Sequence, residues 1–238
     1  MSIILFLFAL ICVYSMKIMP VKEFNNGYIS KNDTTAVKGI FVFMVFLSHF
    51  TQYYKMSTAF DNPYKALKTF LCQLIVVVFL FYSGYGIFES IKRKGSEYIK
   101  SFPTKRCLKV LLHFDIALVL FLIYGLATGK KIKLLTFILS LIGWESIGNS
   151  NWFIFVIVVQ YLIVFVAFLI FKKNNPAAII TTTVLSVAFI IFLSKFKATY
   201  WYDTALCLPA GMWYSFFKDK IEKFVMKNNI TYCITFAL

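Results

Sequence analysis

A histidine and a lysine fall on one side of an apolar segment near the N-terminus. Residues 36–54 read AVKGIFVFMVFLSHFTQYY and carry Lys38 and His49 but no acidic residue. In a helix, a separation of eleven residues places these two side chains within about 20° of one another and about 16 Å apart along the axis. An imidazole titrates near neutral pH, so His49 is a candidate general base. The alternative is that His49 makes a hydrogen bond that packs one helix against another.

A second group of basic residues lies just before the apolar run 108–127. Lys105, Arg106 and Lys109 occur within five positions. A guanidinium group matches phosphate oxygens in a fork, so Arg106 with Lys105 is a candidate site for the phosphates of an anionic cofactor. The alternative is that these cations anchor the end of a helix at the membrane surface.

Polar side chains also occur inside or beside other apolar runs. His113 and Asp115 follow the basic group but are two residues apart, so they do not face each other on a helix. An Asp within a membrane requires a partner. Ser83 and Tyr85 flank a glycine, which permits close helix packing and offers hydroxyls in a low-dielectric setting. We expect these two residues to be either acceptor-binding or structural.

A polar and aromatic cluster surrounds residues 144–152. Glu145 and Trp152 could form a stacking, hydrogen-bonding surface for a sugar, although aromatic residues there are also typical of a membrane interface. The other members of this group are Trp144, Asn149, Asn151 and, later in the chain, Asp203.

Composition identifies the class of protein. Of 238 residues 60% are hydrophobic, and the mean hydropathy of +0.77 excludes an ordinary soluble domain. The net charge of +15 comes from basic residues between apolar runs, where anionic headgroups account for them, so we expect no nucleic acid partner. Five scattered cysteines without a C-x-x-C pair predict neither a disulfide framework nor a metal site.

The apolar runs predict an all-α, polytopic transmembrane helix bundle that forms a single membrane-embedded domain over residues 1–238. About seven runs have spanning length, and the first is a retained span because it lacks a cleavage site. A shorter run, 134–144, suits a re-entrant or interfacial segment, and 230–238 suits a partial span of a truncated chain. The seven predicted spans are 2–19, 36–54, 69–88, 108–127, 152–171, 177–194 and 200–217.

Charge asymmetry predicts the orientation. If 134–144 does not cross, 17 Lys and Arg residues lie on one side and 8 on the other; if it crosses, the counts are 13 and 12. The positive-inside rule therefore favours a segment that does not cross. This topology places Lys38 and the loop 89–107 at the cytoplasmic face.

The ordered set of motifs resembles the acyltransferase 3 family of polytopic membrane O-acyltransferases. The resemblance covers about residues 36–217 and rests on a basic residue followed by His49, the FLFYSGY sequence ending at Tyr85, and a basic loop containing Arg106. It continues with Trp152 opening a span and with the sequence LPAGM at 208–212. The family's usual arginine is replaced by Lys38, which keeps the charge but not the bidentate geometry.

The resemblance implies transfer of an acyl group, usually acetyl, from a coenzyme A thioester to a hydroxyl of a sugar, polysaccharide or other cell-envelope acceptor. It implies His49 as catalytic base and a bacterial plasma membrane location. We expect Lys38, Lys105 and Arg106 to bind the donor, with no permanently bound cofactor and no metal. Two alternatives stay open: a transporter or flippase using His49 and Asp115, and an inactive truncated member of the family.

Overall fold

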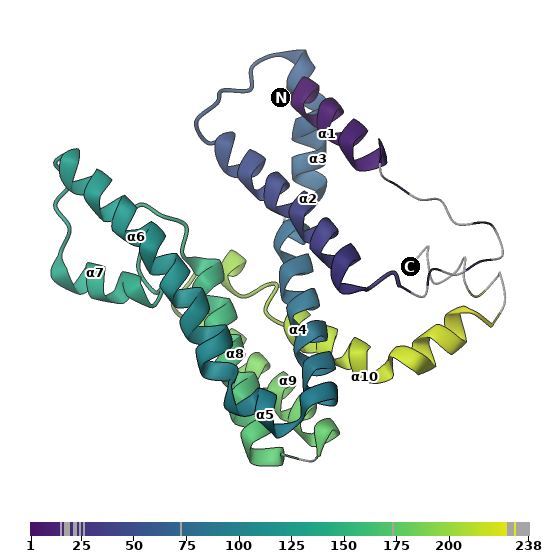
Figure 1. Ribbon diagram of the computed structural model, residues 1–238. Coiled ribbons are helices and arrows are strands. Elements are labelled where there is room, and N and C mark those ends of the chain that lie inside the picture. Colours follow the sequence, from purple (N-terminus) through teal and green to yellow (C-terminus); the bar gives the residue numbers. More distant parts are fainter. Residues whose placement is uncertain are drawn as a thin grey trace. The chain divides into compact units, whose positions relative to one another are not determined.

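The computed structural model describes residues 1–14, 16, 20, 23, 25, 27–71, 73–172, 174–227 and 231. These residues form helices and connecting turns, without strands (Figure 1). They fall into two compact units, Met1–Phe79 and Leu80–Leu238. Five of the described helices are long and apolar enough to cross a membrane. The part of the chain that the structure describes is therefore all-helical and has the helices of an integral membrane protein, while the expected count of seven spans is not confirmed.

The first unit contains α1 (Ser2–Tyr14), α2 (Lys31–Phe50), η1 (Ala59–Asp61), α3 (Asn62–Leu71) and the start of α4 (Leu74–Lys94). The Ser30 hydroxyl caps α2 by accepting a hydrogen bond from the Asp33 amide at 3.2 Å. At 13 residues, α1 rises only about 20 Å, which is too short for a span. The rest of the expected span 2–19 lies largely outside the described residues. The core of this unit is Met44, Leu47, Tyr64 and Ile75.

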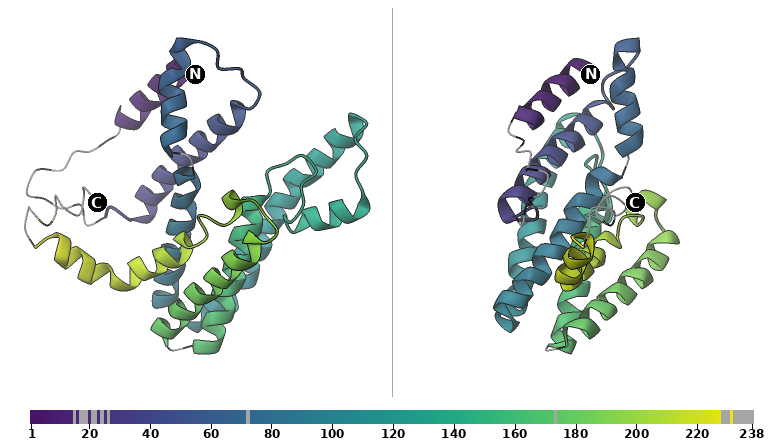
Figure 2. Two further views of the ribbon diagram at one scale, coloured as in Figure 1. Left: turned by 180° about the vertical axis from the view of Figure 1, so that it is seen from behind. Right: turned by 90° about the vertical axis from the view of Figure 1, so that its right-hand side faces the viewer.

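The second unit is a helix bundle, and α8 (Trp152–Phe171) lies at its centre. Its elements after α4 are α5 (Ser96–Lys100), η2 (Pro103–Leu108), α6 (Lys109–Ala127), α7 (Leu134–Leu141), α8 (Trp152–Phe171), α9 (Asn175–Ser194), η3 (Thr199–Trp201) and α10 (Cys207–Val225). α8 and α9 lie side by side (Figure 2), and α8 also packs on α6 and η2. The bounds of α8 coincide with the predicted span, and those of α9 nearly so. An apolar run buried on several sides becomes the centre of the bundle.

The prediction of a continuous span over residues 200–217 is wrong. The chain forms η3 and turns first, and α10 begins only at Cys207. The buried Gln160 amide donates a hydrogen bond to the Ala205 carbonyl at 3.3 Å and accepts one from the Ser186 hydroxyl at 2.8 Å. Because Gln160 lies well inside α8, its amide supplies a hydrogen bond to a carbonyl of this non-helical segment within the bundle. α10 is also not among the candidate spans, since its second half is rich in charge: Lys218, Asp219, Lys220, Glu222 and Lys223.

Two other expected spans have different bounds. The run 69–88 is divided between α3 and α4, and the run 36–54 becomes a helix that starts at Lys31 and ends at Phe50. The expected partial span 230–238 lies outside the described residues except for Thr231. Among the described residues are three cysteines, Cys12, Cys107 and Cys207, and all three are free thiols.

The short apolar run 134–144, which contains α7, begins and ends at the same end of the second unit. α7 has 8 residues, a rise of about 12 Å, which cannot cross a bilayer. The Lys130 ammonium before α7 donates a hydrogen bond to the Ile147 carbonyl after it at 2.7 Å. Two positions on opposite membrane faces could not make this bond. The geometry agrees with the predicted segment that does not cross.

Candidate functional site

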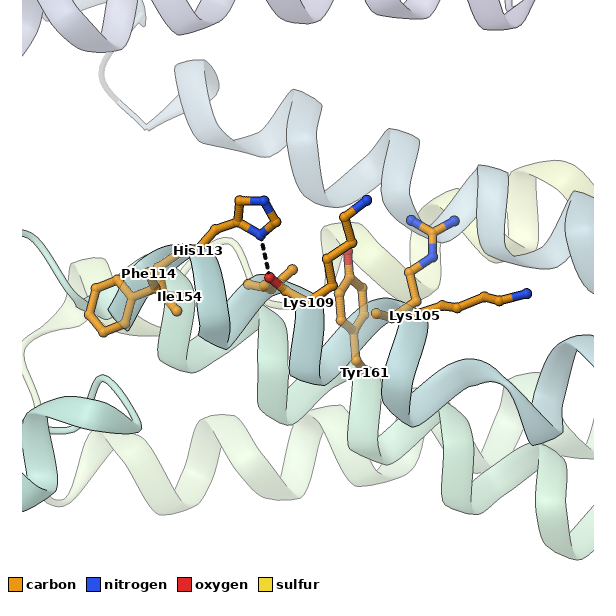
Figure 3. A pocket seen from close by; sticks show the side chains of 8 residues that line it. Lys105, Lys109, His113, Phe114, Ile154 and Tyr161 are labelled. Atoms are coloured by element: carbon orange, nitrogen blue, oxygen red, sulfur yellow. Dashed lines mark hydrogen bonds between the residues drawn. The ribbon is translucent and has the colours of Figure 1, made fainter. Parts of the chain in front are cut away.

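A basic pocket opens where the π-helical turn η2 passes into α6. It has a volume of about 570 Å³, and its lining residues are Lys105, Arg106, Lys109, Val110, His113, Phe114, Ile154 and Tyr161. His113 and Lys109 project to the same side as the Tyr161 hydroxyl (Figure 3). No acidic residue is in this lining, so the pocket suits an anion with an apolar portion. π-helical turns are frequent at functional sites because they change the register of the side chains that follow.

Arg106 is half-buried and contacts tyrosine hydroxyls. Its Nε donates a hydrogen bond to the Tyr98 hydroxyl at 3.0 Å, and the Tyr161 hydroxyl is also within hydrogen-bonding reach of the guanidinium. Both tyrosines belong to the hydrophobic core. A cation that only anchored a helix at the lipid surface would extend toward headgroups and water instead. Arg106 therefore lines the pocket and is bonded to a core tyrosine, while its donor-binding role stays a prediction.

Ser83 reaches the same region from α4. Its hydroxyl lies 2.7 Å from the Tyr161 hydroxyl, so the structure brings Ser83, Tyr161 and Arg106 together. Tyr85 is not in the pocket; its ring lies 6.2 Å from that of Tyr214 on α10. Of this predicted pair, Ser83 belongs to the polar network and Tyr85 to helix packing.

His113 and Asp115 differ in their surroundings. The His113 Nδ1 lies 2.6 Å from the Lys109 carbonyl oxygen, a bond in which Nδ1 is the donor because a carbonyl oxygen can only accept. Asp115 does not line the pocket. Among the described residues, one buried oxygen of its carboxyl group has no hydrogen-bond partner. The two side chains do not form a pair, as their spacing predicts.

Lys38 and His49 lie in the first unit, on α2. Both fall within this one helix, so the shared face expected from their spacing is present. The His49 ring is exposed, with the Gln52 amide nitrogen 3.4 Å from its Nδ1. Lys38 is half-buried and has no hydrogen-bond or ion-pair partner among the described residues of this unit. The catalytic role of His49 and the donor-binding role of Lys38 stay predictions.

Glu145 and Trp152 lie at the opposite end of the second unit from α5. Lys197 occupies the centre of that end: its Nζ is 4.0 Å from the Trp144 ring centre, 4.5 Å from that of Trp201 and 3.9 Å from Glu145. The Trp152 ring packs edge to face on Tyr200 at 5.9 Å. Glu145 is therefore engaged in a local ion pair, and the predicted sugar-binding role of both residues stays untested.

Three residues of these sites were not identified from the sequence: Tyr98, Tyr161 and Lys197. Tyr161 and its neighbour Gln160 are the polar side chains in the middle of an otherwise apolar run, and this signal could have identified them. No comparable signal identifies Tyr98 or Lys197, since tyrosine and lysine are ordinary residues beside a membrane span.

Comparison with known proteins gives one match. The model of the acyltransferase 3 family, described as an acyltransferase domain, matches residues 33–238. No curated protein and no solved structure matches the chain. The match includes most of α2 with its histidine, the basic pocket and α10.

Proposed function

The chain belongs to the acyltransferase 3 family, and from this membership we propose that it transfers an acyl group from a coenzyme A thioester to a hydroxyl of a cell-envelope acceptor, such as a sugar. The family and the apolar helices make it a membrane-embedded acyltransferase. The identity of the donor, the identity of the acceptor and the location in a bacterial plasma membrane are what we propose beyond this.

The observation that carries the proposal is the basic pocket. Coenzyme A has three phosphate groups followed by a long, mainly uncharged arm that ends in the thioester. Lys105, Arg106 and Lys109 supply clustered cations for phosphates, and Val110 and Phe114 supply an apolar wall beside them. In the predicted topology this pocket begins at the cytoplasmic face, where acyl-coenzyme A is made.

His49 is proposed as the base for the acceptor. Its imidazole would take the proton of the acceptor hydroxyl, and the oxygen would form a bond with the thioester carbonyl carbon. The carbon–sulfur bond then breaks, and the departing thiolate receives a proton from the imidazolium. Lys38 on the same helix face supplies a positive charge that favours an anionic donor without contributing a bidentate contact.

Donor binding tests this proposal directly. The full chain in detergent is titrated with acetyl-coenzyme A at several salt concentrations, as wild type and as Arg106→Gln. We expect Arg106→Gln to weaken binding about tenfold and to reduce the salt dependence, because a charge-assisted contact to phosphate is lost. Lys195→Gln is the matched control, since Lys195 is exposed on a distant loop. Equal effects of the two variants would mean general surface charge and would contradict the proposed donor site.

Product analysis tests the acceptor. Mass spectrometry of envelope glycans from cells with and without the chain should show an added acyl mass only when the chain is present. Unchanged glycans together with intact acetyl-coenzyme A binding would exclude a glycan acceptor while leaving the donor site in place.

A further inference from the structure

Three aromatic rings form a rigid row beneath the basic pocket. Phe102 lies between Tyr98 and Tyr161, with both ring pairs edge to face at a centroid distance of 5.7 Å. Phe102 is 1% exposed, Tyr98 9% and Tyr161 4%. Buried aromatic rings in this arrangement have little freedom to rotate. The two tyrosine hydroxyls are therefore presented at fixed positions.

Both of these hydroxyls meet the same guanidinium group. Tyr98 accepts the hydrogen bond of Arg106 Nε, and the Tyr161 hydroxyl is within reach of the same side chain. Ser83 on α4 bonds the Tyr161 hydroxyl at 2.7 Å and thereby sets the direction of its lone pairs. A guanidinium group has five N–H donors in a fixed fork, so these contacts leave others free for a ligand.

We propose that Tyr98 and Tyr161 are positioning residues that orient the Arg106 guanidinium toward the basic pocket, and that Ser83 orients Tyr161 for this task. The inference rests on the proposed function, in which Arg106 binds the phosphates of the donor. An arginine side chain without such supports samples many rotamers, and ordering it on binding reduces affinity. The tyrosines establish this order before the ligand arrives.

The arrangement joins four separate elements. Tyr98 comes from α5, Arg106 from η2, Tyr161 from α8 and Ser83 from α4. The π-helical turn carries Arg106 at the point where the helix register changes. The serine of the FLFYSGY sequence thus acts on the basic loop through a tyrosine more than 70 residues further along the chain.

Conservative variants test this proposal. Tyr98→Phe and Tyr161→Phe keep the ring row and remove one hydroxyl each, and Ser83→Ala removes the contact that orients Tyr161. For the full chain in detergent, we expect each Phe variant to weaken acetyl-coenzyme A binding about three- to tenfold, and Ser83→Ala less, since each removes one contact that orders a charged group. In an acyl-transfer assay, KM for the donor should rise while kcat changes little. Tyr124→Phe, on the exposed surface of α6, is the matched control and should change neither.

Double variants distinguish positioning from other roles. In an Arg106→Gln background the Phe substitutions should have no further effect on binding, because the group that they position is absent. An undiminished effect in that background would mean direct ligand contact or general destabilisation and would overturn the proposal. Weaker binding by Arg106→Gln with unchanged binding by all three hydroxyl variants would overturn the positioning role alone. No effect of Arg106→Gln itself would overturn both the positioning role and the donor site.

Discussion

Gly84 of α4 and Gly211 of α10 make a reciprocal backbone contact. A Cβ atom at position 84 would overlap the Leu208 carbonyl oxygen, and a Cβ at position 211 would overlap the Phe81 carbonyl oxygen. In a membrane, small residues allow two helices to approach closely and gain packing contacts that hydrophobicity does not supply. The FLFYSGY and LPAGM sequences, more than 100 residues apart, are therefore the two sides of one helix crossing.

We predict that Gly84→Ala destabilises the protein by about 1–3 kcal/mol, because the backbone of α10 must move to admit one methyl group. The same change at Gly211 should have a similar effect. The measurement is thermal unfolding in detergent, followed by tryptophan fluorescence. Gly86→Ala is the matched control on α4, since nothing lies within 4 Å of a Cβ built there. An equal loss of stability for Gly86→Ala would assign the effect to the helix backbone rather than to the crossing.

We predict that His49→Ala abolishes acyl transfer while the protein is still made and inserted. Removing a polar group from a span eases insertion, so the loss should appear in turnover alone. The measurement is free coenzyme A released per mole of purified protein. Ser48→Ala is the control, because adjacent residues on a helix point in different directions. Retained turnover in His49→Ala would refute the general-base role, and loss of the protein itself would indicate a structural hydrogen bond.

We predict that both ends of α7 face the outer side of the membrane. Single cysteines at Lys131 and Ser150, introduced into a chain lacking its native cysteines, should react with an impermeant thiol reagent added outside intact cells. A cysteine at Lys94 should react only after permeabilisation. The contact between Lys130 and Ile147 and the charge asymmetry both lead to this expectation. Labelling of positions 131 and 150 from opposite sides would refute the topology.

We predict that Lys197→Met destabilises the outer end of the bundle by about 1–3 kcal/mol. The ammonium group faces two tryptophan rings and donates a hydrogen bond to the Trp144 carbonyl at 2.9 Å, and methionine keeps the length but not the charge or the donor. Thermal unfolding is the measurement. Lys195→Met, two residues earlier and exposed, should leave the unfolding temperature unchanged.

Local composition was enough to predict the class of the protein and several of its elements. The run 152–171 predicts α8 with its bounds, because a long apolar segment has only a helix available to satisfy its backbone in lipid. The run 134–144 predicts a segment too short to cross. The common face of Lys38 and His49 follows from helical geometry alone, because both residues lie on one helix. The motifs in order also predict the family that the comparison shows.

Contacts between distant segments decided the rest. Whether Arg106 anchors a helix in lipid or enters a pocket depends on the Tyr98 and Tyr161 hydroxyls, which local composition does not place beside it. The break before Cys207 depends in the same way on Gln160, whose buried amide bonds the Ala205 carbonyl 45 positions later. A polar group within a bundle is stable only where a partner lies at hydrogen-bonding distance. The sequence lists the polar groups, but only the packing of the helices decides which of them become partners.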